Sequence, residues 1–72
     1  MKDYDPKKLL TKRELEILCL VVEGLSRKDI ADALYLSVNT VRFHLANIYD
    51  KLQVSNKTEA FYRAKRLGIL PL

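Results

Sequence analysis

The stretch from Ser37 to Val54 carries side chains suited to contact a partner of mixed polarity. If this stretch is helical, one side of it presents Asn39, Thr40, Phe43, Ala46, Asn47 and Asp50. A phenylalanine, two asparagines and a small residue, flanked by Arg42, differ from the charged face of an ordinary solvated helix. The major groove of DNA offers hydrogen-bond donors, acceptors and thymine methyl groups, which such a face would match. The pattern therefore predicts a recognition helix.

The opposite side of the same stretch carries a regular apolar series. Val41, Leu45, Ile48 and Leu52 recur at the spacing of a helix, so they define one buried stripe. A helix with this stripe turned towards a core must turn Phe43 away from it. The spacing therefore predicts a helix over residues 38–52 that packs through one side and leaves the other side free.

Further helices must surround this one to cover its buried stripe. Thr11, Ser26, Ser37 and Asn56 are residue types that cap helix N-termini, and Gly24 and Gly68 suit positions just past helix ends. Together with the apolar periodicity, these signals predict helices at about residues 11–23, 27–35, 38–52 and 57–67. Only two or three residues separate the second helix from the third, which predicts a helix-turn-helix. We expect an all-α, four-helix, bundle-like domain with no strand.

The composition favours a single small domain without catalytic or metal chemistry. Residues 1–9 read as a tail or the end of a linker, and residues 10–72 as the domain. One cysteine excludes an internal disulfide and gives no metal cluster, and we expect no cofactor. One histidine and no clustered carboxylates leave no pair of nucleophile and base, so an enzyme is the least favoured class.

The net charge of +4 is unevenly distributed. Residues 1–36 carry seven basic and seven acidic side chains, whereas residues 37–72 carry six basic and two acidic ones. The whole excess therefore lies in the half with the predicted recognition helix, which indicates a polyanionic partner; a solvated basic face is the alternative. The longest apolar run, residues 17–22, is too short to span a membrane, and no signal peptide is recognisable, so a cytoplasmic protein is expected.

A series of ordered motifs fits one known pattern. The motifs are Leu10-Thr11-x-Arg13-Glu14-x-Glu16-Ile17-Leu18, Glu23-Gly24-Leu25-Ser26, Ile30-Ala31-x-x-Leu34, Ser37-x-x-Thr40-Val41-Arg42-x-His44, Ile48-Tyr49-x-Lys51-Leu52 and Ala60. They closely resemble the LuxR-type (GerE-type) DNA-binding domain of bacterial transcription regulators, over about residues 10–68. The end of the chain, from Thr58 to Leu70, looks more specifically like the large MalT-like activators. The resemblance implies a major-groove helix at 38–52, two domains paired on double-stranded DNA through the fourth helix, and RNA polymerase as a candidate partner.

These arguments define two groups of DNA contacts and one pairing surface. Arg42 can reach a guanine edge or a phosphate, Asn47 can form two hydrogen bonds with adenine, and Phe43 can contact a thymine methyl group. The expected base contacts are Arg42, Phe43, Ala46 and Asn47. The expected phosphate contacts are Ser26, Arg27, Lys28, Asn39, Thr40, His44, Lys51 and Lys57. The expected pairing contacts on the fourth helix and beyond are Tyr62, Leu67 and Leu70.

Several alternatives stay open from the sequence. Helix capping alone would explain Ser26 and Ser37, and packing on the flank of a helix would explain His44. A promoter-reading region of a sigma factor also uses a helix-turn-helix, but it does not need the helix after Asn56. A small helical protein-interaction module is the third reading, because the first helix is apolar nearly all round.

Overall fold

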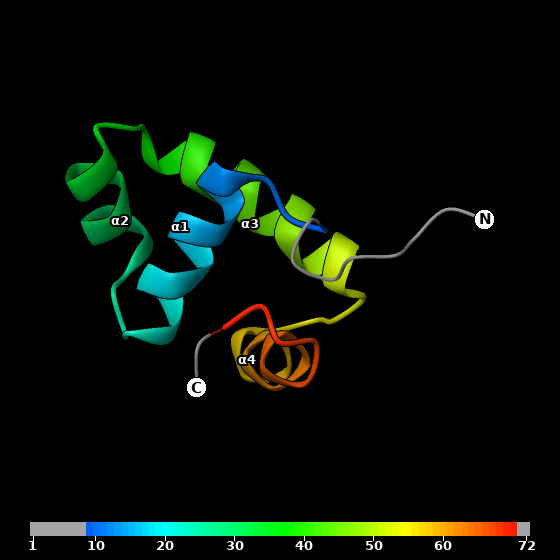
Figure 1. Cartoon of the computed structure of the whole chain (residues 1–72). Helices are drawn as coiled ribbons and strands as arrows, with labels where there is room; N and C mark the ends of the chain where they lie inside the picture. Colours follow the sequence, from blue (N-terminus) through cyan, green and yellow to red (C-terminus); the bar gives the residue numbers. More distant parts are fainter. Residues whose placement is uncertain (1–8, 71–72) are drawn as a thin grey trace.

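The computed structural model describes residues 9–70, which form four helices and, within that range, no strand. Their bounds are Lys12–Val22 for α1, Arg27–Leu34 for α2, Val38–Leu52 for α3 and Lys57–Arg66 for α4. No predicted helix end differs from these by more than one residue, so the all-α helix-turn-helix prediction is confirmed. In Figure 1, α2 lies beside the beginning of α3 and α4 lies below its end. Of the expected tail at 1–9, all but Leu9 lies outside the described residues.

Each helix begins at a polar residue that caps its first turn. The side chains of Thr11, Ser26, Ser37 and Asn56 accept hydrogen bonds from the backbone N–H three residues later, at 2.9–3.1 Å. In α1 the Glu14 carboxylate also accepts from the Thr11 backbone N–H at 2.9 Å, which completes a capping box. The first backbone N–H groups of a helix have no partner inside it, so these caps explain the sharp starts. All four predicted caps are confirmed.

The connection between α2 and α3 is tight because its first residue is left-handed. Tyr35 caps the C-terminus of α2 with φ of 59°, and Leu36 donates its N–H to the Ala31 carbonyl at 2.8 Å. Only Tyr35, Leu36 and Ser37 then separate the two helices. A left-handed backbone is strained for a side chain of this size, and glycine adopts it more readily. The turn therefore holds α2 and α3 at a fixed angle, with the Tyr35 side chain 94% exposed.

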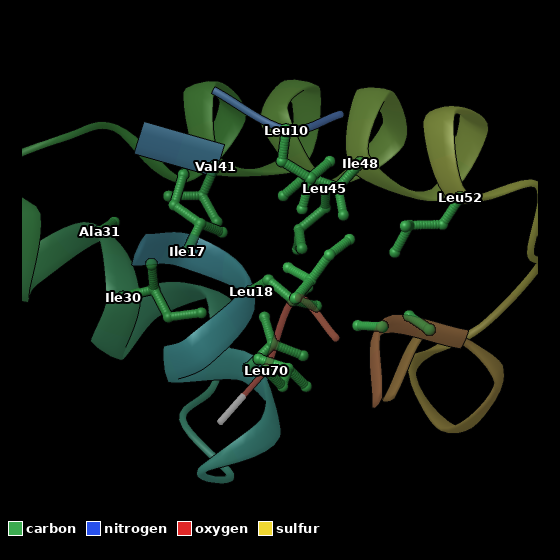
Figure 2. Packing of buried hydrophobic residues seen from close by; sticks show 14 residues of the cluster. Leu10, Ile17, Leu18, Ile30, Ala31, Val41, Leu45, Ile48, Leu52 and Leu70 are labelled. Carbon is green, nitrogen blue, oxygen red and sulfur yellow. The ribbon is translucent and has the colours of Figure 1, made fainter. Parts of the chain in front are cut away.

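The core forms where α3 crosses α1, α2 and α4. The predicted stripe Val41, Leu45, Ile48 and Leu52 is buried, none of the four being more than 5% exposed. Facing it are buried residues of the other three helices, namely Ile17, Leu18, Val21, Ile30, Ala31, Ala60 and Ala64. Figure 2 shows the α3 side chains pointing towards Ile17 and Leu18 of α1. Because α3 is held by apolar contacts along one side only, its other side stays available.

The end of the chain corrects one prediction. We expected Leu70 to be a pairing contact, but it is 5% exposed and belongs to the core, as does Ile69 at 8%. The Ile69 backbone N–H donates to the Ala64 carbonyl at 2.9 Å, and the segment folds back from α4 towards α1 (Figures 1 and 2). A domain this small has few apolar side chains, so covering α1 with these two adds substantially to the buried area. Leu70 therefore stabilises the monomer.

A partly buried ion pair joins the beginning of α1 to the end of α3. The Glu14 side chain is 6% exposed, and its Oε1 accepts from Lys51 Nζ at 2.7 Å as well as from Thr11. Burial raises the pKa of Glu14, but the hydrogen bonds from Lys51 and Thr11 and the charge of Lys51 outweigh this, so the pKa lies below its ordinary value. The folded state therefore favours the carboxylate form.

This ion pair predicts part of the acid sensitivity of the fold. A carboxyl whose pKa is lowered on folding stabilises the protein above its unfolded pKa, about 4.3, and loses that effect as the pH falls through the folded value. At pH 7, Glu14→Gln should lower the free energy of unfolding by about 1.5–3 kcal/mol, the range for hydrogen bonds to charged groups. Urea unfolding at pH 7 and at pH 3 should show the difference from wild type shrinking at the lower pH.

Glu16→Gln is the matched control for that measurement. Glu16 lies 3.4 Å from Arg13, but both side chains are about half exposed, at 50% and 43%. Such surface pairs contribute about 0–1 kcal/mol, so this variant should follow wild type at both pH values. A Glu14→Gln deficit that is equally large at pH 3 would contradict the role given to the carboxylate.

Candidate nucleic-acid interface

The free side of α3 presents the expected base contacts together. Arg42, Phe43 and Ala46 are exposed and Asn47 is half-buried, all on the side away from the buried stripe. Phe43 is 65% exposed, and its only aromatic neighbour among the described residues is His44, with ring centroids 6.2 Å apart. A large apolar side chain on a helix surface with so little cover indicates a contact made outside the domain. Asp50 is also exposed, beyond Asn47 towards the end of the helix.

The beginning of α3 carries a small network of hydroxyl groups. Ser37 Oγ accepts from the Thr40 N–H at 3.0 Å, and the Ser37 hydroxyl donates to Thr40 Oγ1 at 2.8 Å. The cap therefore explains Ser37 completely, while Thr40 keeps its own hydroxyl hydrogen available for donation. Asn39 is exposed in the same turn, and Thr40 is half-buried. This turn points polar donors out of the N-terminus of the helix, where the helix dipole favours an anion.

A basic cleft lies between α2, α3 and α4. It encloses about 190 Å³ and is lined by Ser26 and Arg27 of the α2 start, Tyr49 of α3 and Lys57 of the α4 start. The apolar side chains that line it are Val21, Leu25, Ile30 and Leu45. Two cations from segments thirty residues apart thus line one cleft beside two helix N-termini, a combination that favours an anion such as phosphate.

Tyr49 was not among the predicted contacts. Burial raises the pKa of its hydroxyl, and the positive charge of Arg27 acts in the opposite direction, so the group stays protonated and can donate a hydrogen bond. Its position was readable from the sequence, since Tyr49 follows Arg42 by seven residues, or about two helical turns, and so lies on the same flank of α3. The sequence could not show that Arg27 lies near Tyr49, because only the fold brings the two residues together.

Three of the expected phosphate contacts, Lys28, His44 and Lys51, differ in their exposure and in the side chains beside them. Lys28 is exposed and pairs with Asp32 at 3.1 Å, a surface contact that contributes little and can exchange for a phosphate. His44 is half-buried beside Phe43. Lys51 is held by the buried Glu14 carboxylate, which competes with any phosphate for its ammonium group. Lys51 therefore has a role in the folding of the domain, and its contact with a phosphate stays a prediction.

The outer side of α4 carries an aromatic surface. Tyr62 is 58% exposed and meets Phe61 edge to face, with ring centroids 5.3 Å apart. The Lys65 ammonium lies 5.9 Å from the centre of the Phe61 ring, within the range of a cation–π contact. A groove of about 230 Å³ runs beside them, lined by Val22, Lys57, Thr58, Phe61 and Tyr62. Of the expected pairing contacts, Tyr62 is thus exposed, Leu67 is half-buried and Leu70 is buried.

Neither a metal site nor a membrane-spanning segment is found in residues 9–70. No group of three or more His, Cys, Asp or Glu side chains in that range could hold a metal ion. No helix in the same range has the length and apolar content needed to cross a bilayer.

Two proteins of Bacillus subtilis (strain 168) share much of this sequence. The transcriptional regulatory protein LiaR is 49% identical over 61 residues, which cover 85% of this chain and 29% of LiaR. The spore germination protein GerE is 41% identical over 71 residues, which cover 99% of this chain and 96% of GerE. The chain therefore spans less than a third of the first relative and almost the whole of the second.

The fold agrees with these similarities. The solved structure of the transcription factor GerE superimposes with a TM-score of 0.82 at 46% identity, over 88% of this chain and 94% of that one. The family model for bacterial regulatory proteins of the luxR family matches residues 8–64. The chain therefore belongs to the luxR family of bacterial regulatory proteins.

Proposed function

We propose that this domain binds double-stranded DNA sequence-specifically, with α3 in the major groove, as the output domain of a cytoplasmic transcription regulator. The observation that carries the proposal is the free side of α3, where Phe43 is 65% exposed between Arg42 and Asn47. An α-helix fits the major groove, and that groove distinguishes all four base pairs. No enzymatic activity is part of the proposal.

The base contacts are Arg42, Phe43, Ala46 and Asn47. Arg42 donates to a guanine edge, and the Asn47 amide pairs with an adenine through two hydrogen bonds. Phe43 and Ala46 supply apolar contacts suited to thymine methyl groups. Asp50 would repel phosphates at the far end of the helix, so the N-terminal half of α3 enters the groove more deeply than its C-terminal half.

The phosphate contacts hold the domain on the duplex on both sides of that helix. Arg27, Lys57 and the Tyr49 hydroxyl line one cleft, so they can bind the same or adjacent phosphates. Ser26, Lys28, Asn39, Thr40 and His44 complete the proposed set. Contacts of this kind fix the position of the domain without reading sequence.

Two copies bind together, paired through α4. One domain reads bases with the free side of a single helix, which is little for tight specific binding. Tyr62 and the half-buried Leu67 are the proposed contacts between copies, and the groove beside Tyr62 gives an aromatic partner somewhere to pack. In an activator, the bound pair would also present a surface to RNA polymerase.

Selection of sites from random double-stranded DNA tests this function directly. We expect one short sequence to be enriched, present twice at a constant separation because two copies bind as a pair. The control is the Phe43→Ala variant. It should keep the non-specific binding that phosphate contacts provide, but it should enrich the preferred sequence less strongly than wild type. Failure of the wild-type chain to enrich any sequence would refute specific binding, and single half-sites would refute pairing.

The basic cleft predicts a salt dependence. Each phosphate neutralised by a cation contributes about −0.9 to the slope of log affinity against log salt concentration. Lys57→Ala should therefore weaken binding to all DNA sequences about equally and flatten the slope by about one unit. Fluorescence anisotropy at several salt concentrations measures this. Lys12→Ala is the control, because Lys12 lines a groove between α1 and α2 outside the proposed interface. A slope unchanged by Lys57→Ala would remove the cleft from the interface.

A further inference from the structure

One hydrogen bond links α4 directly to the end of α3. The Arg63 guanidinium donates from Nη1 to the Leu52 carbonyl oxygen at 2.9 Å, across eleven residues of sequence. Among residues 9–70 it is the only side-chain hydrogen bond between these two helices. Leu52 is the last residue of α3, so its carbonyl has no partner within the helix. The positive charge of Arg63 also lies at the negative end of the α3 dipole.

The side chains of α4 that are fully buried in the core are small, and the larger Phe61 and Leu67 are only partly buried against it. The buried residues within α4 are Ala60 and Ala64, both 0% exposed. Methyl groups give close approach but little interdigitation, so they define the angle between two helices less sharply than larger side chains do. A hydrogen bond to a carbonyl has a preferred direction as well as a preferred length. Arg63 therefore adds a directional contact to the apolar packing that orients α4 against α3.

Arg63 and the proposed pairing contact lie on different sides of α4. Arg63 is half-buried towards α3, whereas Tyr62, one residue earlier, is 58% exposed on the outer side. The backbone of α4 thus connects its outer surface to Arg63, and Arg63 contacts the last residue of α3. A change in the angle of α4 would alter where a second copy holds its own α3.

We propose that Arg63 is a positioning residue that sets the separation of the two DNA half-sites. The proposal rests on the proposed function, namely on two copies pairing through α4. Each of the two paired domains contains this bond. A change in the angle between α3 and α4 therefore displaces both α3 helices, and the two displacements add in the distance between them. One base pair advances the duplex by about 3.4 Å, so a displacement of that size changes the preferred spacing. In the proposed complex, Arg63 acts through the Leu52 carbonyl and contacts neither DNA nor the second copy.

The test compares Arg63→Met with Arg66→Met in the 72-residue chain. Methionine keeps an apolar stem and removes the donor, and Arg66 is an exposed cation on the same helix, so both variants lose one charge. Affinities are measured for a single half-site and for pairs of half-sites at a series of separations. Wild type and Arg66→Met should prefer one separation by about tenfold or more, as expected when the second binding event is intramolecular.

Arg63→Met should bind the single half-site within about twofold of wild type and show a spacing preference below about threefold. Arg63→Gln, whose shorter amide does not reach the Leu52 oxygen, should behave in the same way if Arg63→Met fails to fold. A spacing preference that survives in these variants overturns the positioning role, and so does an equal loss on the single half-site. A wild-type chain that reads a single half-site without any spacing preference overturns pairing and the positioning role together, while specific DNA binding stands.

Discussion

Leu45→Ala is expected to lower the free energy of unfolding by about 2–5 kcal/mol, the largest effect of any change on α3 that we discuss. Leu45 is 5% exposed within the stripe that packs α3 on the other helices. Truncation removes buried apolar area and leaves a cavity that a small core can fill only partly. Total stabilities of about 5–15 kcal/mol are usual, so a loss of this size is a large part of the total. The urea concentration at which half of the protein is unfolded should therefore fall clearly below that of wild type.

Phe43→Ala is the matched control for this result. Phe43 lies two residues before Leu45 on the same helix, but it is 65% exposed on the opposite side. Removing a larger side chain there should change the free energy of unfolding by no more than about 0.5 kcal/mol, the usual range for surface changes. Urea unfolding followed by circular dichroism compares the two variants. If both variants lost a similar free energy of unfolding, the side of α3 that carries Phe43 would also be packed against the core, and the assigned orientation of the helix would be wrong.

The second large effect concerns sequence reading. Asn47→Ala should lose about 1–3 kcal/mol of binding free energy on the preferred site, the range for a two-bond contact with a base. On random DNA its affinity should match wild type, because the side chain is neutral and makes no phosphate contact in the proposed complex. Both affinities can be measured by anisotropy titration at one fixed salt concentration, with specific and random duplexes of equal length.

Two outcomes would refute the role of Asn47. Equal losses on specific and random DNA would make it a contact that only holds the duplex. A fall in the melting temperature would mean that its half-buried side chain stabilises the fold. Ala46→Ser gives a useful comparison, because it adds a hydroxyl on the same exposed face and leaves the core untouched.

The helices and their caps were predictable because their causes are local. A capping side chain such as Ser37 acts on an N–H three residues away, and an apolar stripe repeats every three or four residues. The free side of α3 followed for the same reason: once Val41 and Leu45 face inward, the period of the helix turns Phe43 outward. Binding by α3 could therefore be inferred before any tertiary contact was known.

The fate of Leu70 was not predictable in this way. An apolar residue after the last helix could cover the core of its own domain or that of a second copy, and both bury the same surface. The structure shows that α1 leaves room for it within the domain. The same holds for Lys51, whose partner Glu14 lies 37 residues away in sequence.

The sequence by itself thus determined the four helices, their caps, the family resemblance and the side of α3 that stays free. Only the tertiary structure brought Arg27 to Tyr49 and Lys57, paired Lys51 with Glu14, and attached Arg63 to the end of α3. The physical reason is the range of the forces involved. Helix formation depends on neighbours within about four residues, which a sequence displays directly. Contacts between helices depend on how all apolar surfaces are covered at once, and this is settled only when the chain packs.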